Sequence, residues 1–142
     1  MTLVLDASVF LKWLLEDPAR EPDTDQAFAV IQSVIQGDQE ILQPVHWLIE
    51  VAAVAARLTP QTAIHDVEML EAMQLPTSDD PGVMRRATAL AIDTGTQMFD
   101  ALYHAVALEH DDALLVTADD RYRRKATRYG KIVSLHDWGG AT

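Results

Sequence analysis

The sequence predicts an α/β fold in which a parallel sheet carries helices on both faces. Short apolar runs alternate along the chain with longer segments of helical periodicity, and this alternation is typical of a parallel sheet built from strand–helix units. The chain has 142 residues, of which 49% are hydrophobic, so it is long enough for one domain with a buried core. We expect that single domain to span residues 1–142.

Five segments are candidate strands. The clearest is 113–117, Ala-Leu-Leu-Val-Thr, which is short, apolar and typical of a fully buried strand. Residues 2–6 form another apolar run, which ends at an acid. Residues 40–43, 74–76 and 131–135 are weaker candidates. In such sheets ligands bind beyond the carboxyl ends of the strands, so those ends are where chemistry is expected.

Four helices are expected in the first half of the chain: 7–15, 24–36, 45–58 and one that opens at Thr59-Pro60. Asp17-Pro18 should break the chain after the first, and Gly37 should cap the second. Thr59 is a favoured N-cap residue, and proline suits the first helical position. The stripes expected to face the core are Phe28, Ile31, Val34 and Ile35 on the second helix, and Ile64, Val67, Leu70 and Met73 on the fourth.

Three helices are expected in the second half, and each begins at a polar residue that can accept hydrogen bonds from the first turn. They run from Ser78 or Asp79 to about 94, from Asp100 to about 110, and from Asp119 to about 128. Gly95 and Gly130 follow the first and the third, where a left-handed C-terminal cap belongs.

The composition excludes several kinds of protein. The chain has no cysteine, which rules out disulfides, a thiolate nucleophile and a cysteine zinc site, and it fits a cytoplasmic protein. The sequence contains no apolar run of about 18 residues and no signal-peptide pattern, so no membrane association is expected. The motifs of P-loop, dinucleotide-binding, zinc-protease and serine-hydrolase sites do not occur in the sequence.

The formal net charge of −11 argues against a protein that coats nucleic acid through general electrostatics. A polyanionic substrate would need bound cations or a local basic patch. Six of the eleven basic residues do lie close together in the sequence, and we predict that they contact substrate phosphates; a solvated helix face is the alternative. This basic segment consists of Arg121, Arg123, Arg124, Lys125, Arg128 and Lys131.

Two acids follow the two clearest strands. Asp6 ends the first apolar run, and Asp119 stands just beyond the strand 113–117. If these strands are parallel neighbours, the two carboxylates meet at one edge of the sheet. The alternative is that both are helix N-caps, and Arg123 also offers Asp119 an ion pair at helical spacing.

Two more acids lie on apolar helices. Glu50 is the one charge in the stretch 47–56, and its neighbours at helical spacing include no Lys or Arg. An unpaired buried carboxylate is costly, so Glu50 should shift its pKa, find a distant partner or bind a metal; an exposed position is the alternative. Asp100 heads an apolar helix and could instead be an N-cap. His104, one turn on, is left out of the site because a lone helical histidine is more often structural.

Together the four acids form a more specific pattern than any of them alone. Converging carboxylates repel one another unless cations neutralise them, and oxygen ligands suit Mg²⁺ or Mn²⁺. One or two such ions could activate a water and stabilise the leaving oxygen of a phosphodiester. Ser8 and Thr117 carry hydroxyls placed to hold a metal-bound water or a phosphate oxygen.

These residues fall within four blocks that resemble the signature blocks of the PIN-domain family. The blocks occur in the family's order and cover nearly the whole chain. They are Leu5-Asp6-Ala7-Ser8-Val9 with Lys12-Trp13, the segment from Pro44 to Glu50-Val51, Phe99-Asp100-Ala101-Leu102-Tyr103, and Leu115-Val116-Thr117-Ala118-Asp119. A domain of this length looks most like the VapC-type toxins of prokaryotic toxin–antitoxin pairs.

The resemblance implies a three-layer α/β/α architecture with a central parallel sheet of four to five strands. It implies a hydrolase, a Mg²⁺- or Mn²⁺-dependent endoribonuclease that cleaves RNA by a metal-activated water. It also implies a homodimer and an antitoxin partner that blocks the site. By position the family's acidic, metal-binding residues match Asp6, Glu50, Asp100 and Asp119, and its supporting hydroxyls match Ser8 and Thr117. The Thr-Ala-Asp pattern favours Asp119 over its neighbour Asp120.

Two alternatives remain open from the sequence. The acidic charge is compatible with a PIN-like binding or regulatory module that has lost its activity. A PIN nuclease that acts on structured DNA or in RNA processing, without an antitoxin, is the other. Asp111-Asp112 also occupies a turn where relatives often carry glycine.

Overall fold

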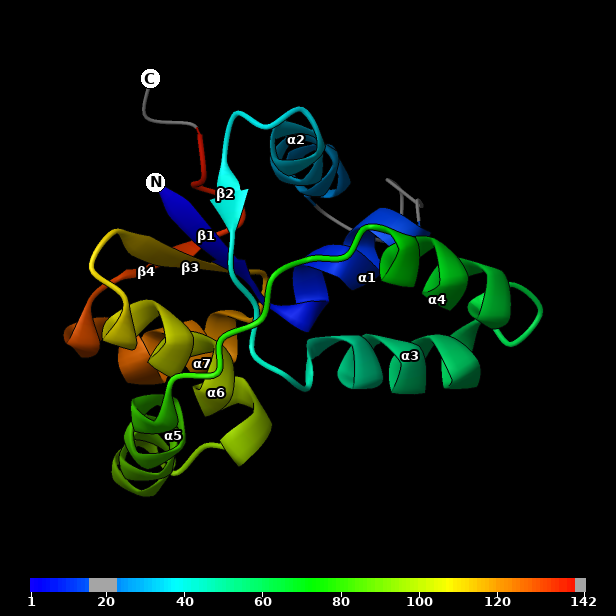
Figure 1. Ribbon diagram of the computed structural model, residues 1–142. Helices are drawn as coiled ribbons and strands as arrows, with labels where there is room; N and C mark the ends of the chain where they lie inside the picture. The colour runs from blue at the N-terminus through cyan, green and yellow to red at the C-terminus, as the bar shows by residue number, and fades with distance from the viewer. Residues whose placement is uncertain (16–22, 140–142) are drawn as a thin grey trace.

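The computed structural model describes residues 1–15 and 23–139, and its centre is a four-stranded parallel sheet (Figure 1). The strands are β1 (Thr2–Leu5), β2 (Glu40–Ile41), β3 (Ala113–Thr117) and β4 (Ile132–Ser134), in the order β2-β1-β3-β4. All three pairings are parallel. The predicted three-layer α/β/α architecture with a parallel sheet of four to five strands is therefore confirmed.

The two central strands bring distant parts of the chain together. β1 pairs with β3 over its whole length, with Leu5 opposite Val116. Leu3, Val4 and Leu5 are buried, because a parallel strand between two helical layers has no solvent-facing side. Both strands end at the same edge of the sheet, so the residues that directly follow β1 and β3 lie close together there.

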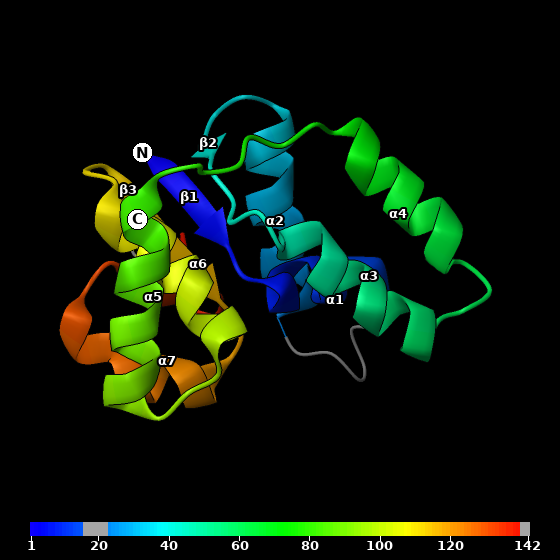
Figure 2. The ribbon, with the colours of Figure 1, turned by 60° about the horizontal axis from the view of Figure 1, so that its bottom comes forward.

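Seven helices flank this sheet among the described residues. They are α1 (Ala7–Leu15), α2 (Thr24–Ile35), α3 (Trp47–Leu58), α4 (Ala63–Ala72), α5 (Pro81–Thr94), α6 (Met98–Glu109) and α7 (Asp120–Ala126), the last continued by a 3₁₀ turn at Thr127–Tyr129. Figures 1 and 2 show α5, α6 and α7 gathered on one side of the molecule and α1, α3 and α4 on the other. α6 packs directly on β1 and β3, and α5 packs on α6. None of the described helices has the length and apolar character needed to span a membrane.

The apolar stripes of two helices differ from the prediction. On α2 the buried side chains are those of Ala27, Val30 and Ile31, whereas Phe28 and Ile35 are exposed. On α4 Leu70 is buried, as predicted, but Ile64 is 76% exposed and Ala63 is buried in its place. On each helix one alanine, Ala27 or Ala63, is buried at the contact face where the prediction placed its larger neighbour. Because the prediction favours the larger apolar residue, the predicted contact face of each helix is turned away from the observed one.

Two predicted caps are also wrong. Thr59 ends α3 instead of opening α4, since its N–H and its hydroxyl both donate to the Ala55 carbonyl. α4 begins only at Ala63. The cap of α5 is Asp80, not Ser78 or Asp79: its carboxylate accepts from the Gly82 N–H at 2.8 Å, and proline occupies the first helical position.

The remaining differences are small. Residues 74–76 form no strand; the nearest pairing is a single parallel bridge between Gln43 and Thr77. The helix expected to start at Asp100 begins two residues earlier, at Met98. Gly37 and Gly95 have positive φ angles of 81° and 69°, as their predicted capping positions require. Gly130 also has a positive φ of 78°, but its ψ of −177° is not that of a left-handed cap. The break expected at Asp17-Pro18 lies outside the described residues.

Candidate active site

Asp6 stands where β1 ends, and a neighbouring serine holds its carboxylate. The Ser8 hydroxyl donates to Asp6 Oδ2 at 2.5 Å, and the Ser8 N–H donates to the same oxygen at 3.2 Å. The Ser8 oxygen in turn accepts from the Ala118 N–H at 3.0 Å, which ties the end of β1 to the end of β3. Burial raises the pKa of Asp6 to about 6, although the bonds from Ser8 oppose that shift.

Asp119 follows β3 and caps α7. Its Oδ1 accepts from the Tyr122 N–H at 3.0 Å, and its own N–H donates to the Thr117 hydroxyl oxygen at 2.9 Å. The capping role considered from the sequence is therefore real. The cap uses only Oδ1 of Asp119, and this hydrogen bond fixes the direction in which the other carboxylate oxygen points.

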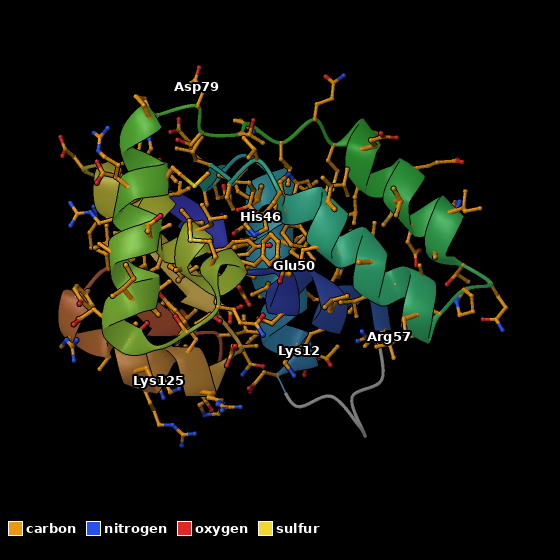
Figure 3. The ribbon with its side chains drawn as sticks, turned by 90° about the horizontal axis from the view of Figure 1, so that it is seen from below. Lys12, His46, Glu50, Arg57, Asp79 and Lys125 are labelled. Atoms are coloured by element: carbon orange, nitrogen blue, oxygen red, sulfur yellow. The ribbon has the colours of Figure 1, made fainter. Side chains whose placement is uncertain are left out.

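Glu50 lies one turn into α3 with its side chain 28% exposed, so it is less buried than the apolar stretch around it suggested. The Glu50 carboxylate also has two partners. His46 Nε2 lies 3.1 Å from Glu50 Oε2, and the Tyr103 hydroxyl donates to the same oxygen at 3.3 Å. Figure 3 labels His46 and Glu50, which lie side by side near the middle of the molecule. The distant partner that the sequence left open is Tyr103, 53 residues away.

Asp100 lies in the first turn of α6, which begins at the same edge of the sheet. Burial raises the pKa of Asp100 to about 6, and repulsion from Asp119 and Glu50 adds to the shift, whereas His46 opposes it. Glu50 and Asp100 in turn repel the charge of Asp6. Asp100 is thus electrostatically coupled to each of the other three predicted acids, and Glu50 is coupled to Asp6 as well.

The four carboxylates form an open cluster. Within residues 1–15 and 23–139, no three Asp, Glu or His side chains are grouped closely enough to hold a metal ion directly. An open arrangement of oxygen ligands suits Mg²⁺, which keeps several of its waters and binds proteins through only one or two carboxylates. The pKa values of Asp6 and Asp100 are raised mainly by burial and further by their acidic neighbours, and a divalent cation would offset both effects, so the residues present fit such an ion.

A pocket of about 360 Å³ opens beside Asp100 and Asp119. The loop 95–97 forms part of its wall, and α7 contributes Arg121 and Lys125. These two basic residues are four positions apart and therefore lie on one face of the helix. A polyanion entering the pocket would meet cations on one wall and carboxylates at the other.

The rest of the basic segment is largely committed to the protein itself. Three of its members have acidic or carbonyl partners: Arg123 pairs with Asp120, Arg128 with Asp93, and Lys131 with the backbone carbonyls of His110 and Asp111. The six residues of the predicted basic segment therefore fall into three groups: three with protein partners, two at the pocket, and Arg124, which is exposed and does not line the pocket. Arg121 and Lys125 line the pocket, and Figure 3 shows the Lys125 side chain extending from α7.

His104 is structural, as expected. Its Nε2 lies 2.7 Å from the Gly130 carbonyl, so that nitrogen carries the hydrogen, and Nδ1 accepts from the Tyr122 hydroxyl at 2.9 Å. Burial lowers the pKa of His104, which keeps the ring neutral. His46, Tyr103 and Gln43 could not be predicted from local patterns, because their contacts with Phe99, Glu50 and Leu5, respectively, join residues distant in the sequence.

Comparison with known proteins agrees with this geometry. A family model described as the PIN domain matches residues 3–128 of the 142-residue chain. Comparison with curated proteins gives no match. PIN domains have in general a metal-dependent nuclease fold, and typically use divalent metal ions. The match includes three of the four residues of β1, the whole of β3 and all four acids, and on this evidence the chain belongs to the PIN-domain family.

Proposed function

We propose that this protein is a Mg²⁺- or Mn²⁺-dependent endoribonuclease and the toxin of a type II toxin–antitoxin pair. The observation that carries the proposal is the cluster of Asp6, Glu50, Asp100 and Asp119 beside a pocket with a basic wall. A nuclease needs both parts, since one stabilises charge at the scissile phosphate and the other binds the chain of phosphates.

The four acids are the proposed ligands of the metal centre. A divalent cation held among them would lower the pKa of a water and offset the charge that develops on the phosphodiester. The side chains must be ionised to serve as ligands, and at neutral pH the carboxylates of Asp6 and Asp100, with pKa values of about 6, are mostly ionised.

The protein's own groups orient these ligands. Ser8 fixes one oxygen of Asp6, and Thr117 fixes the backbone of Asp119. The sequence pattern predicts that both hydroxyls hold a metal-bound water or a phosphate oxygen. Because each is engaged with a protein group, we propose instead that they position the acids. Arg121 and Lys125 would bind phosphates that flank the cleaved bond.

RNA as substrate, an antitoxin partner, a homodimer and a cytoplasmic location rest on the resemblance to VapC-type toxins. Induction of the gene alone should arrest growth, and co-expression of a short neighbouring reading frame should restore it. Arrest that no neighbouring gene relieves would favour a PIN nuclease of nucleic-acid processing.

The central test is cleavage of RNA by the purified protein with Mg²⁺, with the cut sites determined by sequencing. Asp6→Asn and Asp100→Asn should each reduce the rate by about 100-fold or more while the fold survives. Asp79→Asn is the matched control, because Asp79 is an exposed acid outside the cluster, labelled in Figure 3. Cleavage that persists in both cluster variants would refute the proposal.

A further inference from the structure

His46 lies directly before α3, at the position that normally caps a helix, yet its side chain makes no capping hydrogen bond. The residue is only 9% exposed, so the imidazole is buried. A buried polar ring that does not cap its helix needs another reason to be there. Its other contacts supply one.

The imidazole joins two of the elements that carry the acid cluster. Nε2 of His46 lies 3.1 Å from Glu50 Oε2 and 3.2 Å from the Phe99 carbonyl oxygen. Both partners are acceptors, so Nε2 carries the hydrogen and shares it between them. Glu50 belongs to α3, and Phe99 directly precedes Asp100 in α6. One N–H group therefore links the Glu50 carboxylate to the backbone beside Asp100.

Two aromatic rings hold the imidazole in this orientation. Phe99 stacks on it with ring centres 5.3 Å apart and planes 29° apart, and Tyr103 meets it edge-on at 4.9 Å. The hydroxyl of Tyr103 also reaches Glu50. The ring cannot rotate freely, so Nε2 stays directed at its two acceptors.

This arrangement has a cost that a purely packing residue would avoid. His46 Nδ1 is buried and has no hydrogen-bond partner among the described residues. A leucine would fill similar space without burying an unpaired nitrogen, which is unfavourable. The contacts of Nε2 with Glu50 and with the Phe99 carbonyl are the feature that a histidine provides and a leucine lacks.

We infer that His46 is a positioning residue of the metal centre, which sets the spacing between Glu50 and Asp100. The inference rests on the proposed function, since it assumes that these two acids bind one divalent ion or a pair of ions. Residues that orient metal ligands typically change metal affinity by about 10–100-fold when they are removed.

The test compares substitutions that keep or remove the N–H group at the Nε2 position. His46→Leu removes it at similar volume. His46→Gln retains an N–H at nearly the same reach, and His46→Asn retains an amide that falls short of Glu50. His65→Leu is the matched control, since His65 is an exposed histidine on α4. Each variant is titrated with Mn²⁺ by calorimetry, and its fold is checked by circular dichroism and thermal unfolding.

We expect His46→Leu and His46→Asn to weaken Mn²⁺ binding at least about 10-fold, with His46→Gln and His65→Leu within about 3-fold of the wild type. If the leucine variant does not fold, the comparison of Gln with Asn decides, because both keep a polar side chain. Equal affinities of the Gln and Asn variants, or wild-type affinity in a folded Leu variant, would overturn the inference.

The proposed function is judged separately. Wild-type protein that binds Mn²⁺ but cleaves no RNA would refute the ribonuclease, while the affinities of the variants would still decide the role of His46. Wild-type protein that binds no Mn²⁺ would refute the metal centre and the inference with it.

Discussion

The side-chain amide of Gln43 pairs with both backbone polar groups of Leu5. Its Nε2 donates to the Leu5 carbonyl and its Oε1 accepts from the Leu5 N–H, each at 2.8 Å. β2 pairs with β1 only as far as Ile41 opposite Leu3, so the amide continues the ladder where the strand backbone has left it. Leu5 directly precedes Asp6, and Gln43 thereby fixes the position at which the first carboxylate leaves the sheet.

Gln43→Leu should lower the free energy of unfolding by about 3 kcal/mol, because it leaves a buried N–H and a buried carbonyl without partners. Urea unfolding followed by circular dichroism measures this change. Gln32→Leu, at an exposed position of α2, is the control and should stay within about 0.5 kcal/mol. If Gln43→Leu lowers the free energy of unfolding only slightly, water must reach the backbone of Leu5 in the folded protein.

The cap of α5 gives a second stability prediction. Asp80→Ala removes the oxygen that accepts from the Gly82 N–H and should cost about 1 kcal/mol. Asp79→Ala changes the adjacent residue in the same way but removes no described bond, so its effect should be smaller. Thermal unfolding of both variants compares them. Equal losses would indicate general electrostatics instead of a cap.

The fold could be predicted largely because its central strands and several of its helix ends are local signals. Residues 113–117 form a strand with the predicted bounds, since five residues of one apolar run fit a strand buried on both faces. The orientation of the outer helices could not be predicted in the same way. The sequence suggests that α3 is largely buried, yet Ile49 is 73% exposed, because the helix contacts the rest of the fold along one face only.

The four acids could be named from the sequence as candidate site residues, but the residues that contact them could not. Asp6 and Asp119 stand next to predicted strands, so topology alone brings them together. Tyr103 and Gln43 contact residues 53 and 38 positions away, and nothing in the local pattern shows such pairs. His46 is visible at helical spacing from Glu50, but its contact with Phe99 requires the packing of two helices.

The pKa of Asp6 predicts how stability changes with pH without metal. Its value of about 6 lies above the ordinary 3.8, so the folded protein binds this proton more tightly than the unfolded chain. The stabilisation is complete below about pH 4 and is lost as pH rises through 6, by at most about 3 kcal/mol. Asp6→Asn should therefore be more stable than wild type at pH 7 in the presence of EDTA.

The difference between wild type and Asp6→Asn isolates this effect, because His104 and Asp100 titrate in both proteins. Urea unfolding at pH 4, 5, 6 and 7 measures it, with Asp79→Asn as the control that should show no such trend. A gap that stays constant over this range would mean that burial and the neighbouring acids do not disfavour the charge of Asp6.

Metal binding should reverse this instability. Mn²⁺ at about 100 times its dissociation constant stabilises a folded protein by about 2.7 kcal/mol, which corresponds to a rise in Tm of roughly 5–10 °C for a chain of this size. Wild type should show that rise, and Asp6→Asn a much smaller one, in a thermal scan at pH 7. An unchanged Tm in wild type is the result expected of an inactive PIN-like module.

The last prediction concerns the pocket wall. Arg121→Gln combined with Lys125→Gln should weaken RNA binding and flatten its salt dependence, by a slope of about 0.7 for each phosphate of single-stranded RNA that the two side chains cease to neutralise. Fluorescence anisotropy at several salt concentrations, with EDTA present to prevent cleavage, measures both quantities. Arg57→Gln, at the far end of α3 in Figure 3, should leave the slope unchanged.

Arg124→Gln tests whether RNA binding is confined to the pocket or extends over the whole basic segment, because Arg124 is exposed but does not line the pocket. A slope lowered equally by Arg124→Gln would extend the RNA-binding surface over the outer face of α7, and a slope unaffected by the double variant would leave that wall as solvated surface.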